Sequence, residues 1–169
     1  MTNSVKTDIV QSLRVISYFW LQEENYQCSY SIIQLLNELK LDFKQKKILE
    51  ELEHDFKVMS TGKYTLKDYQ NIKIPKNFCD TEERKLLWIS GVSIMNLFGS
   101  ANFELAYSNL LEMSANWEEL YVFVINNLKK QPFLNLVTEW LFTHFLMVQD
   151  LLGDEMEMLG YKVIKLKEE

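Results

Sequence analysis

The sequence contains few of the residues that interrupt helices: its 169 residues include two prolines and five glycines. The glycines match neither the P-loop nor the dinucleotide-binding spacing, and Ser90 lacks the preceding glycine of a nucleophile elbow. The two cysteines, Cys28 and Cys79, are too few for a disulfide framework, so we expect reduced thiols. These absences remove the usual phosphate-binding and nucleophile motifs, and they favour a helical protein.

A membrane-spanning run is also lacking in the sequence. The longest apolar stretch, residues 133–148, is interrupted by polar residues, among them Glu139 and His144. The first ten residues include Lys6 and Asp8 and lack the apolar run of a secretory signal. The sequence therefore predicts a cytoplasmic protein with no membrane partner.

The sequence has fewer basic than acidic residues: its 18 lysines and arginines and 24 acidic residues give a formal net charge of −6. This balance argues against nucleic acid or an anionic membrane as the partner, and it suits a basic protein better. The hydrophobic share of 47% and the charged share of 25% are typical of a globular protein. No repeat or linker divides the chain, so we predict a single helical domain over residues 1–169.

Helical spacing of apolar residues predicts about six to seven helices in a bundle. Residues 133–152 are expected to form the central helix, because their circumference is almost entirely apolar. A second buried helix is predicted around residues 86–98, where Gly91 leaves room for a close neighbour. The other predicted helices are about 5–21 after an N-cap at Ser4, 31–39, one through Phe56 opened by Asp42 with Gln45, one through Met113 after Ser100, and 116–130.

A small antiparallel β element is the expected exception to this helical pattern. Phe56–Met59 and Lys63–Leu66 flank a Thr-Gly pair and have the order of a hairpin, which residues 161–166 would join as a further strand. The alternative is a helical turn capped by Thr65 and Asp68. The predicted fold class is thus a mainly α, single-domain multi-helix bundle with at most a small β element, at about 57–66 with 161–166.

Few residues suggest catalysis or metal binding. Glu51 and His54 have the i, i+3 spacing of di-iron bundles, but such a site needs the motif twice, and no second copy surrounds His144. His144 is expected to be a hydrogen-bonded core residue; the alternative is a general base, for which no nucleophile stands at a diagnostic spacing. We therefore predict a non-enzymatic protein with no metal and no cofactor.

The order of the first elements leaves one alternative function open, a winged helix-turn-helix regulator that binds DNA. Helices within about residues 5–56 and a hairpin at 57–66 would supply its elements, and Lys44, Lys46 and Lys47 would open the recognition helix. Acidic residues on the same helix would repel DNA phosphates, however: Glu50, Glu51, Glu53 and Asp55. DNA binding is therefore a weaker prediction than the protein-binding function described below.

The second half of the chain combines acidic and aromatic residues. Its acids between residues 80 and 119 are Asp80, Glu82, Glu83, Glu104, Glu112, Glu118 and Glu119, and Trp88, Tyr107, Trp117 and Tyr121 lie among them. Such a face steers a basic protein by charge and anchors it by aromatic side chains, although acidic helices also serve solubility alone.

The predicted partner-binding residues within this stretch are Glu104, Glu112, Trp117, Glu118, Glu119 and Tyr121. The predicted function is non-enzymatic protein binding, most concretely by an acidic immunity- or antitoxin-type neutraliser of a basic, nuclease-like toxin. Nucleic acid itself is not an expected partner.

Overall fold

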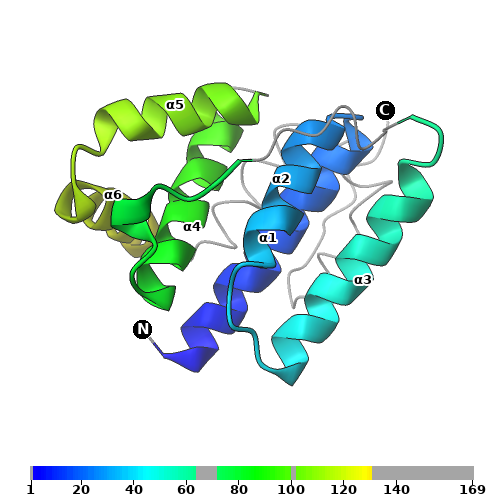
Figure 1. Cartoon of the computed structure of the whole chain (residues 1–169), viewed down its shortest axis with the longest axis horizontal. Coiled ribbons are helices and arrows are strands. Elements are labelled where there is room, and N and C mark those ends of the chain that lie inside the picture. The colour runs from blue at the N-terminus through cyan, green and yellow to red at the C-terminus, as the bar shows by residue number, and fades with distance from the viewer. Residues whose placement is uncertain (1, 64–71, 100–101, 131–169) are drawn as a thin grey trace, which may run out of the picture.

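The computed structural model describes residues 2–63, 72–99 and 102–130. Within these ranges every regular element is helical, which confirms the predicted mainly α multi-helix fold (Figure 1). The elements are α1 (Asn3–Gln22), α2 (Tyr26–Leu36), α3 (Phe43–Met59), the short 3₁₀ helix η2 (Lys76–Phe78), α4 (Glu82–Gly99), α5 (Phe103–Met113) and α6 (Trp117–Lys130). The helix predicted at residues 133–152, with His144, lies outside the described residues.

The prediction of a first hairpin strand at Phe56–Met59 is wrong, because these residues form the last turn of α3. Phe56 is buried at helical spacing from Leu49 and Leu52, and the Ser60 hydroxyl donates to the Phe56 carbonyl at 2.6 Å as the helix ends. This helical packing outweighs the local β propensity. The second arm beyond residue 63 and the strand at 161–166 lie outside the described residues. A winged-helix wing at 57–66 therefore lacks its first strand.

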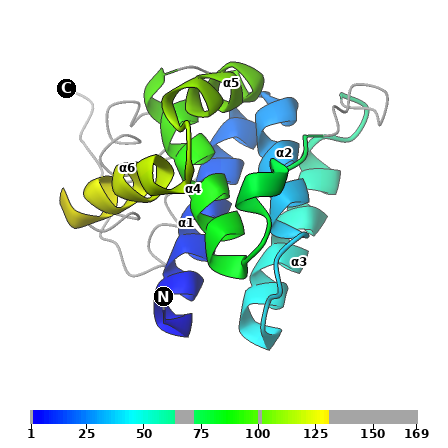
Figure 2. The ribbon, with the colours of Figure 1, turned by 60° about the vertical axis from the view of Figure 1, so that its left-hand side comes forward.

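Helices α1, α2 and α3 run up, down and up, so that α2 lies antiparallel to both neighbours (Figures 1 and 2). Every residue of α1 from Ser12 to Leu21 is buried, so this half of the helix is enclosed on all sides. The helical spacing of apolar residues from Val5 to Trp20 predicted a stripe on one side of this helix only. Polar residues enter the core because their hydroxyls have acceptors: Ser12 donates to the Asp8 carbonyl, and Ser17 donates to the Ser29 carbonyl at 3.0 Å.

Gln45 links the start of α3 to α1. It forms the predicted capping box with Asp42: the Asp42 carboxylate accepts from the Gln45 N–H at 2.8 Å, and Gln45 Oε1 accepts from the Asp42 N–H at 3.1 Å. The fully buried Gln45 side chain also donates to Asn3 Oδ1 and to Thr7 Oγ1, each at 3.0 Å. A local capping signal in the sequence thus also fixes a contact between two helices.

The starts of three other helices differ from the predicted positions. Each begins after a residue whose side-chain oxygen accepts a backbone N–H in the first turn, which is the usual N-cap arrangement. These residues are Thr2 before α1 instead of Ser4, Asn25 before α2 instead of a start near Ser31, and Asn102 before α5 instead of Ser100. The three predicted positions are serines, and the observed caps are a threonine and two asparagines. All three residue types are common N-caps, so residue type alone did not distinguish the predicted position from the observed one.

Helix α4 joins the three-helix group to α5 and α6 (Figure 2). The predicted close approach at Gly91 is confirmed, because a Cβ atom there would lie 3.0 Å from Leu120 Cδ1 of α6 and 3.1 Å from Leu110 Cδ2 of α5. The absent side chain therefore lets both helices pack against α4 at one point. Among the described helices, none is long and apolar enough to cross a membrane.

Candidate functional site

Helix α5 buries one face and exposes a mixed acidic and apolar one. Phe103, Ala106 and Leu110 are buried at helical spacing, and Asn102 caps the helix by accepting the Glu104 N–H at 3.0 Å and the Leu105 N–H at 3.3 Å. The opposite face presents two predicted site residues, Glu104 and Glu112. Large apolar side chains lie exposed beside them: Leu105, Leu111 and Met113. Leu105 keeps 50% of its surface accessible, which is far more than core packing would leave.

Helix α6 repeats this arrangement. Leu120 and Val124 are buried, whereas the predicted site residues Glu118, Glu119 and Tyr121 are exposed, and Val122 is 55% accessible. The helix is opened by a reciprocal cap, since Asn116 Oδ1 accepts the Glu119 N–H at 3.0 Å and Glu119 Oε2 accepts the Ala115 N–H at 2.8 Å. Glu119 therefore stabilises the helix start, whereas Glu118 has no such bond within the described residues.

A shallow groove of about 490 Å³ lies where α5 ends and α6 begins. Its lining combines apolar side chains with two carboxylates: Met113, Asn116, Glu118, Glu119, Val122 and Phe123. An apolar floor beside paired acids is suited to the aliphatic stem and charged head of a lysine or arginine. The structure thus brings Glu118 and Glu119 to a common groove with apolar residues that were not predicted.

Trp117 and Tyr121 form a small aromatic cluster at the start of α6, with ring centroids 5.8 Å apart. The Arg84 guanidinium of α4 lies over the Trp117 ring, 4.8 Å from its centroid, and also donates to Asp80 at 2.5 Å. Trp117 is half-buried by these contacts, whereas Tyr121 remains 41% accessible. Tyr121 is therefore the more exposed anchor, and Trp117 also secures α6 to α4.

The structure divides the predicted run of acids into two groups. At the start of α4, Asp80 forms an ion pair with Arg84, and Glu82 lies 3.8 Å from Lys6 and 3.7 Å from Lys85. By contrast, no lysine or arginine in the described ranges forms an ion pair with the acids of α5 and α6: Glu104, Glu112, Glu118 and Glu119. The four acids of α5 and α6 are therefore uncompensated by ion pairs within the described ranges.

Trp88 is not part of this surface, although the sequence placed it among the aromatic anchors. Its side chain is fully buried, stacked on Phe78 at 4.7 Å and edge-on to Tyr107 at 5.5 Å. Tyr107 is half-buried and donates its hydroxyl to the Lys73 carbonyl at 2.7 Å. Both residues therefore stabilise the packing of η2, α4 and α5, because their rings are enclosed by these elements.

The other chemically distinctive residues do not assemble a metal or nucleophilic site in the described ranges. Glu51 lies 3.7 Å from the buried Arg14, and no group of three or more metal-ligating side chains occurs there. Burial raises the pKa of the Cys28 thiol to about 11, although Asn96 and the Phe103 N–H both donate hydrogen bonds to its sulfur. Cys28 is therefore a protonated, enclosed thiol at neutral pH.

No protein-family model, curated protein or solved structure was found to match this chain.

Proposed function

We propose that this protein acts by binding another protein, which is basic, through the surface of α5 and α6. We call this the acidic surface and define it by Glu104, Glu112, Trp117, Glu118, Glu119 and Tyr121, together with the exposed Leu105, Leu111, Met113 and Val122. The observation that carries the proposal is the joint exposure of uncompensated acids and large apolar side chains on the same two helices.

The charge pattern supports a basic partner. Between Lys85 and Lys129 the sequence has no lysine, arginine or histidine, while Glu104, Glu112 and Glu118 point to solvent from α5 and α6. A field of one sign raises the rate at which an oppositely charged surface arrives and repels nucleic acid.

The apolar side chains support tight contact once the partner has arrived. Acids alone would be sufficient for solubility, but solubility is not improved by exposing Leu105 or Val122. In protein interfaces, aromatic and apolar anchors near the centre supply most of the binding energy, and a polar rim surrounds them. Tyr121, Val122 and Met113 provide such anchors beside Glu118.

The most concrete form of this function is neutralisation of a basic, nuclease-like toxin. A nuclease holds its substrate in a positively charged cleft, so a surface that presents carboxylates at the same place would exclude the nucleic acid. Immunity proteins and antitoxins of this kind need no catalytic group of their own. The proposed role thus requires only the shape and charge of the acidic surface.

The proposal is tested by affinity capture from the native cells after nuclease treatment, with mass spectrometry as the readout. The test variant is Glu112→Lys with Glu118→Lys, since Glu119 is needed for the cap of α6. The control is Glu23→Lys with Glu50→Lys, which changes the net charge equally at two exposed sites outside α5 and α6.

We expect the native protein and the control to retain the same basic protein, and the test variant to lose it. Equal retention by all three proteins would contradict the proposed surface. If the retained proteins disappear after nuclease treatment, nucleic acid bridges them and the proposal is wrong.

A further inference from the structure

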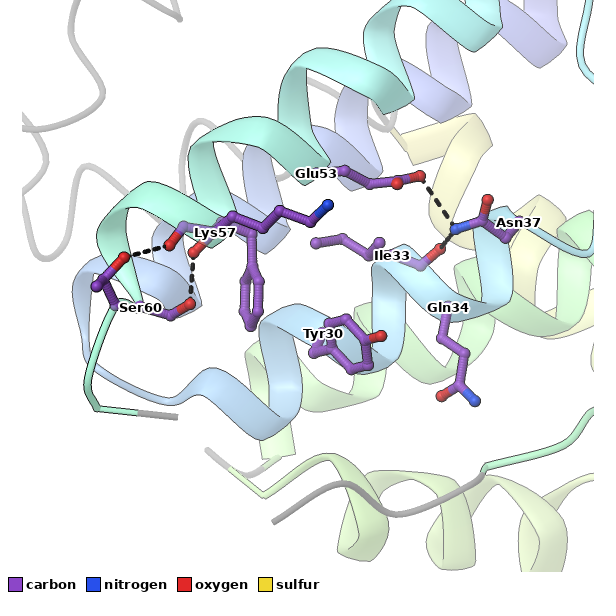
Figure 3. Close-up of a pocket in the computed structure, with 9 residues that line it drawn as sticks. Tyr30, Ile33, Gln34, Asn37, Glu53, Lys57 and Ser60 are labelled. Carbon is purple, nitrogen blue, oxygen red and sulfur yellow. Dashed lines mark hydrogen bonds between the residues drawn. The ribbon is translucent and has the colours of Figure 1, made fainter. Parts of the chain in front are cut away.

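A second hollow lies between the antiparallel helices α2 and α3 (Figure 3). Its volume of about 490 Å³ falls within the range of small-molecule sites, which is roughly 300–1,000 Å³. Phe56 and Ile33 are buried in its wall, and the Tyr30 ring lies 5.1 Å from the Phe56 ring in a tilted arrangement. The wall is thus apolar and aromatic, which suits a flat or branched apolar group.

Two opposite charges lie at the rim of this hollow on the same face of α3. Glu53 and Lys57 are four residues apart in the order that favours an ion pair in a helix, yet no ion pair joins them. Glu53 Oε1 instead accepts a hydrogen bond from Asn37 Nδ2 at 3.2 Å, so its carboxylate turns toward α2 (Figure 3). Lys57 extends its ammonium group in the direction of Ile33.

Three other polar side chains that line the hollow are held by hydrogen bonds to backbone carbonyls. The Ser60 hydroxyl donates to the Phe56 carbonyl at 2.6 Å, and the Thr61 hydroxyl donates to the Lys57 carbonyl at 2.7 Å. The Asn37 amide also donates to the Ile33 carbonyl at 3.0 Å. These bonds fix the ends of α2 and α3, and they leave the Glu53 carboxylate and the Lys57 ammonium as the charged groups that face a ligand.

We propose that the α2–α3 hollow binds a free α-amino acid with an aromatic or large aliphatic side chain. The carboxylate of the amino acid pairs with the Lys57 ammonium, and its ammonium group pairs with the Glu53 carboxylate. The side chain lies against Tyr30, Ile33 and Phe56. A zwitterion is the ligand that satisfies both charges at once, whereas a simple acid or amine would satisfy one and leave the other exposed to a like charge.

The test uses L-phenylalanine as the probe and two analogues that each lack one charge. 3-Phenylpropionate has no ammonium group, and phenethylamine has no carboxylate. Binding to the full chain is followed by backbone amide shifts in NMR spectra and by calorimetry. Loss of one charge-assisted hydrogen bond should weaken binding by about tenfold or more, so both analogues should bind correspondingly less tightly than the amino acid.

Two variants assign the charges to their partners. Lys57→Met should weaken L-phenylalanine and 3-phenylpropionate but leave phenethylamine unchanged, and Glu53→Gln should show the opposite selectivity. Gln at position 53 still accepts the hydrogen bond from Asn37, so α2 and α3 should stay together. Lys47→Met and Glu50→Gln, at exposed positions of α3 outside the lining of the hollow, are the matched controls.

The expected result is a saturable shift of α2 and α3 amides by L-phenylalanine, with the selectivity described for the two variants. The proposal is overturned if L-phenylalanine at millimolar concentration gives no saturable shift. It is also overturned if the three probes bind equally, or if the variants at Glu53 and Lys57 behave like the controls. These outcomes are independent of the acidic surface, which lies on different helices.

Discussion

Replacing Gln45 by alanine tests whether the contact between α1 and α3 depends on hydrogen bonds made by this one buried side chain. The side chain makes three of them: it accepts from the Asp42 N–H and donates to Asn3 and Thr7. A typical intramolecular hydrogen bond contributes about 1 kcal/mol net, so the three together contribute at most about 3 kcal/mol. Asn3 is exposed and can bond to water instead, which reduces the expected loss to about 2 kcal/mol.

The loss should appear in urea unfolding followed by circular dichroism, as a lower midpoint with an unchanged dependence on urea concentration. Gln45→Glu is the companion variant, because it keeps the shape of the side chain but removes the amide donor. Burial raises the pKa of a carboxyl group, so this variant should be destabilised at neutral pH and should recover part of its stability as the pH falls. A loss below about 0.5 kcal/mol for Gln45→Ala would mean that the buried side chain contributes no more to stability than an ordinary surface residue.

Three further predictions concern the core and the surface. Gly91→Val should lower stability by about 1–3 kcal/mol in urea unfolding, because its methyl groups would overlap leucines of α5 and α6; equal or higher stability would contradict the close packing. The pKa of the Cys28 thiol is 9.0 in the unfolded chain and about 11 in the folded protein, so Cys28 contributes stability below pH 9.0 that is lost as the pH rises to about 11. Relative to Cys28→Ser, the native protein should therefore lose up to about 3 kcal/mol of stability over that interval. A difference that does not depend on pH would contradict the burial of the thiol. Trp88→Ala should cost about 3–5 kcal/mol, whereas Tyr121→Ala should change stability by less than about 0.5 kcal/mol, and similar melting temperatures for these two variants would contradict their placement in core and surface.

The parts of the fold that the sequence predicted correctly depend on local signals. The body of α3 follows from the spacing of Leu49, Leu52 and Phe56, and its start follows from the pairing of Asp42 with Gln45. Gly91 was identified because a small residue in an apolar helix indicates a close neighbour. Such signals involve residues a few positions apart, so the helix itself brings them together.

Other features depend on tertiary contacts that no local pattern contains. Trp88 lies in the helix predicted as buried, yet no local pattern indicates that it packs between Phe78 of η2 and Tyr107 of α5. Trp117 lies in an amphipathic stretch, and its contacts with Arg84 and Tyr121 leave it half-buried. The burial of α1 on nearly all sides could not be read from its apolar stripe, because its polar residues find acceptors on neighbouring elements.

The candidate site was predictable in its charges and not in its apolar part. The exposure of Glu104 and Glu118 agrees with the acidic character of the sequence. Leu105, Leu111 and Val122 were missed, although a wheel that places Phe103, Ala106 and Leu110 inward leaves Leu105 and Leu111 outside. The α2–α3 hollow required the positions of two helices relative to each other, so the spacing of Glu53 and Lys57 gave no indication of it.

The most direct test of the acidic surface is the salt dependence of the association rate between this protein and the basic protein that it captures. Stopped-flow measurements at several salt concentrations would compare the native protein with the Glu112→Lys, Glu118→Lys variant and with the Glu23→Lys, Glu50→Lys control. We expect the native protein and the control to associate rapidly at low salt and to slow steeply as salt is added, while the test variant is slow throughout. Association rates that are the same for all three proteins, or that do not respond to salt, would mean that the acidic surface does not steer the partner.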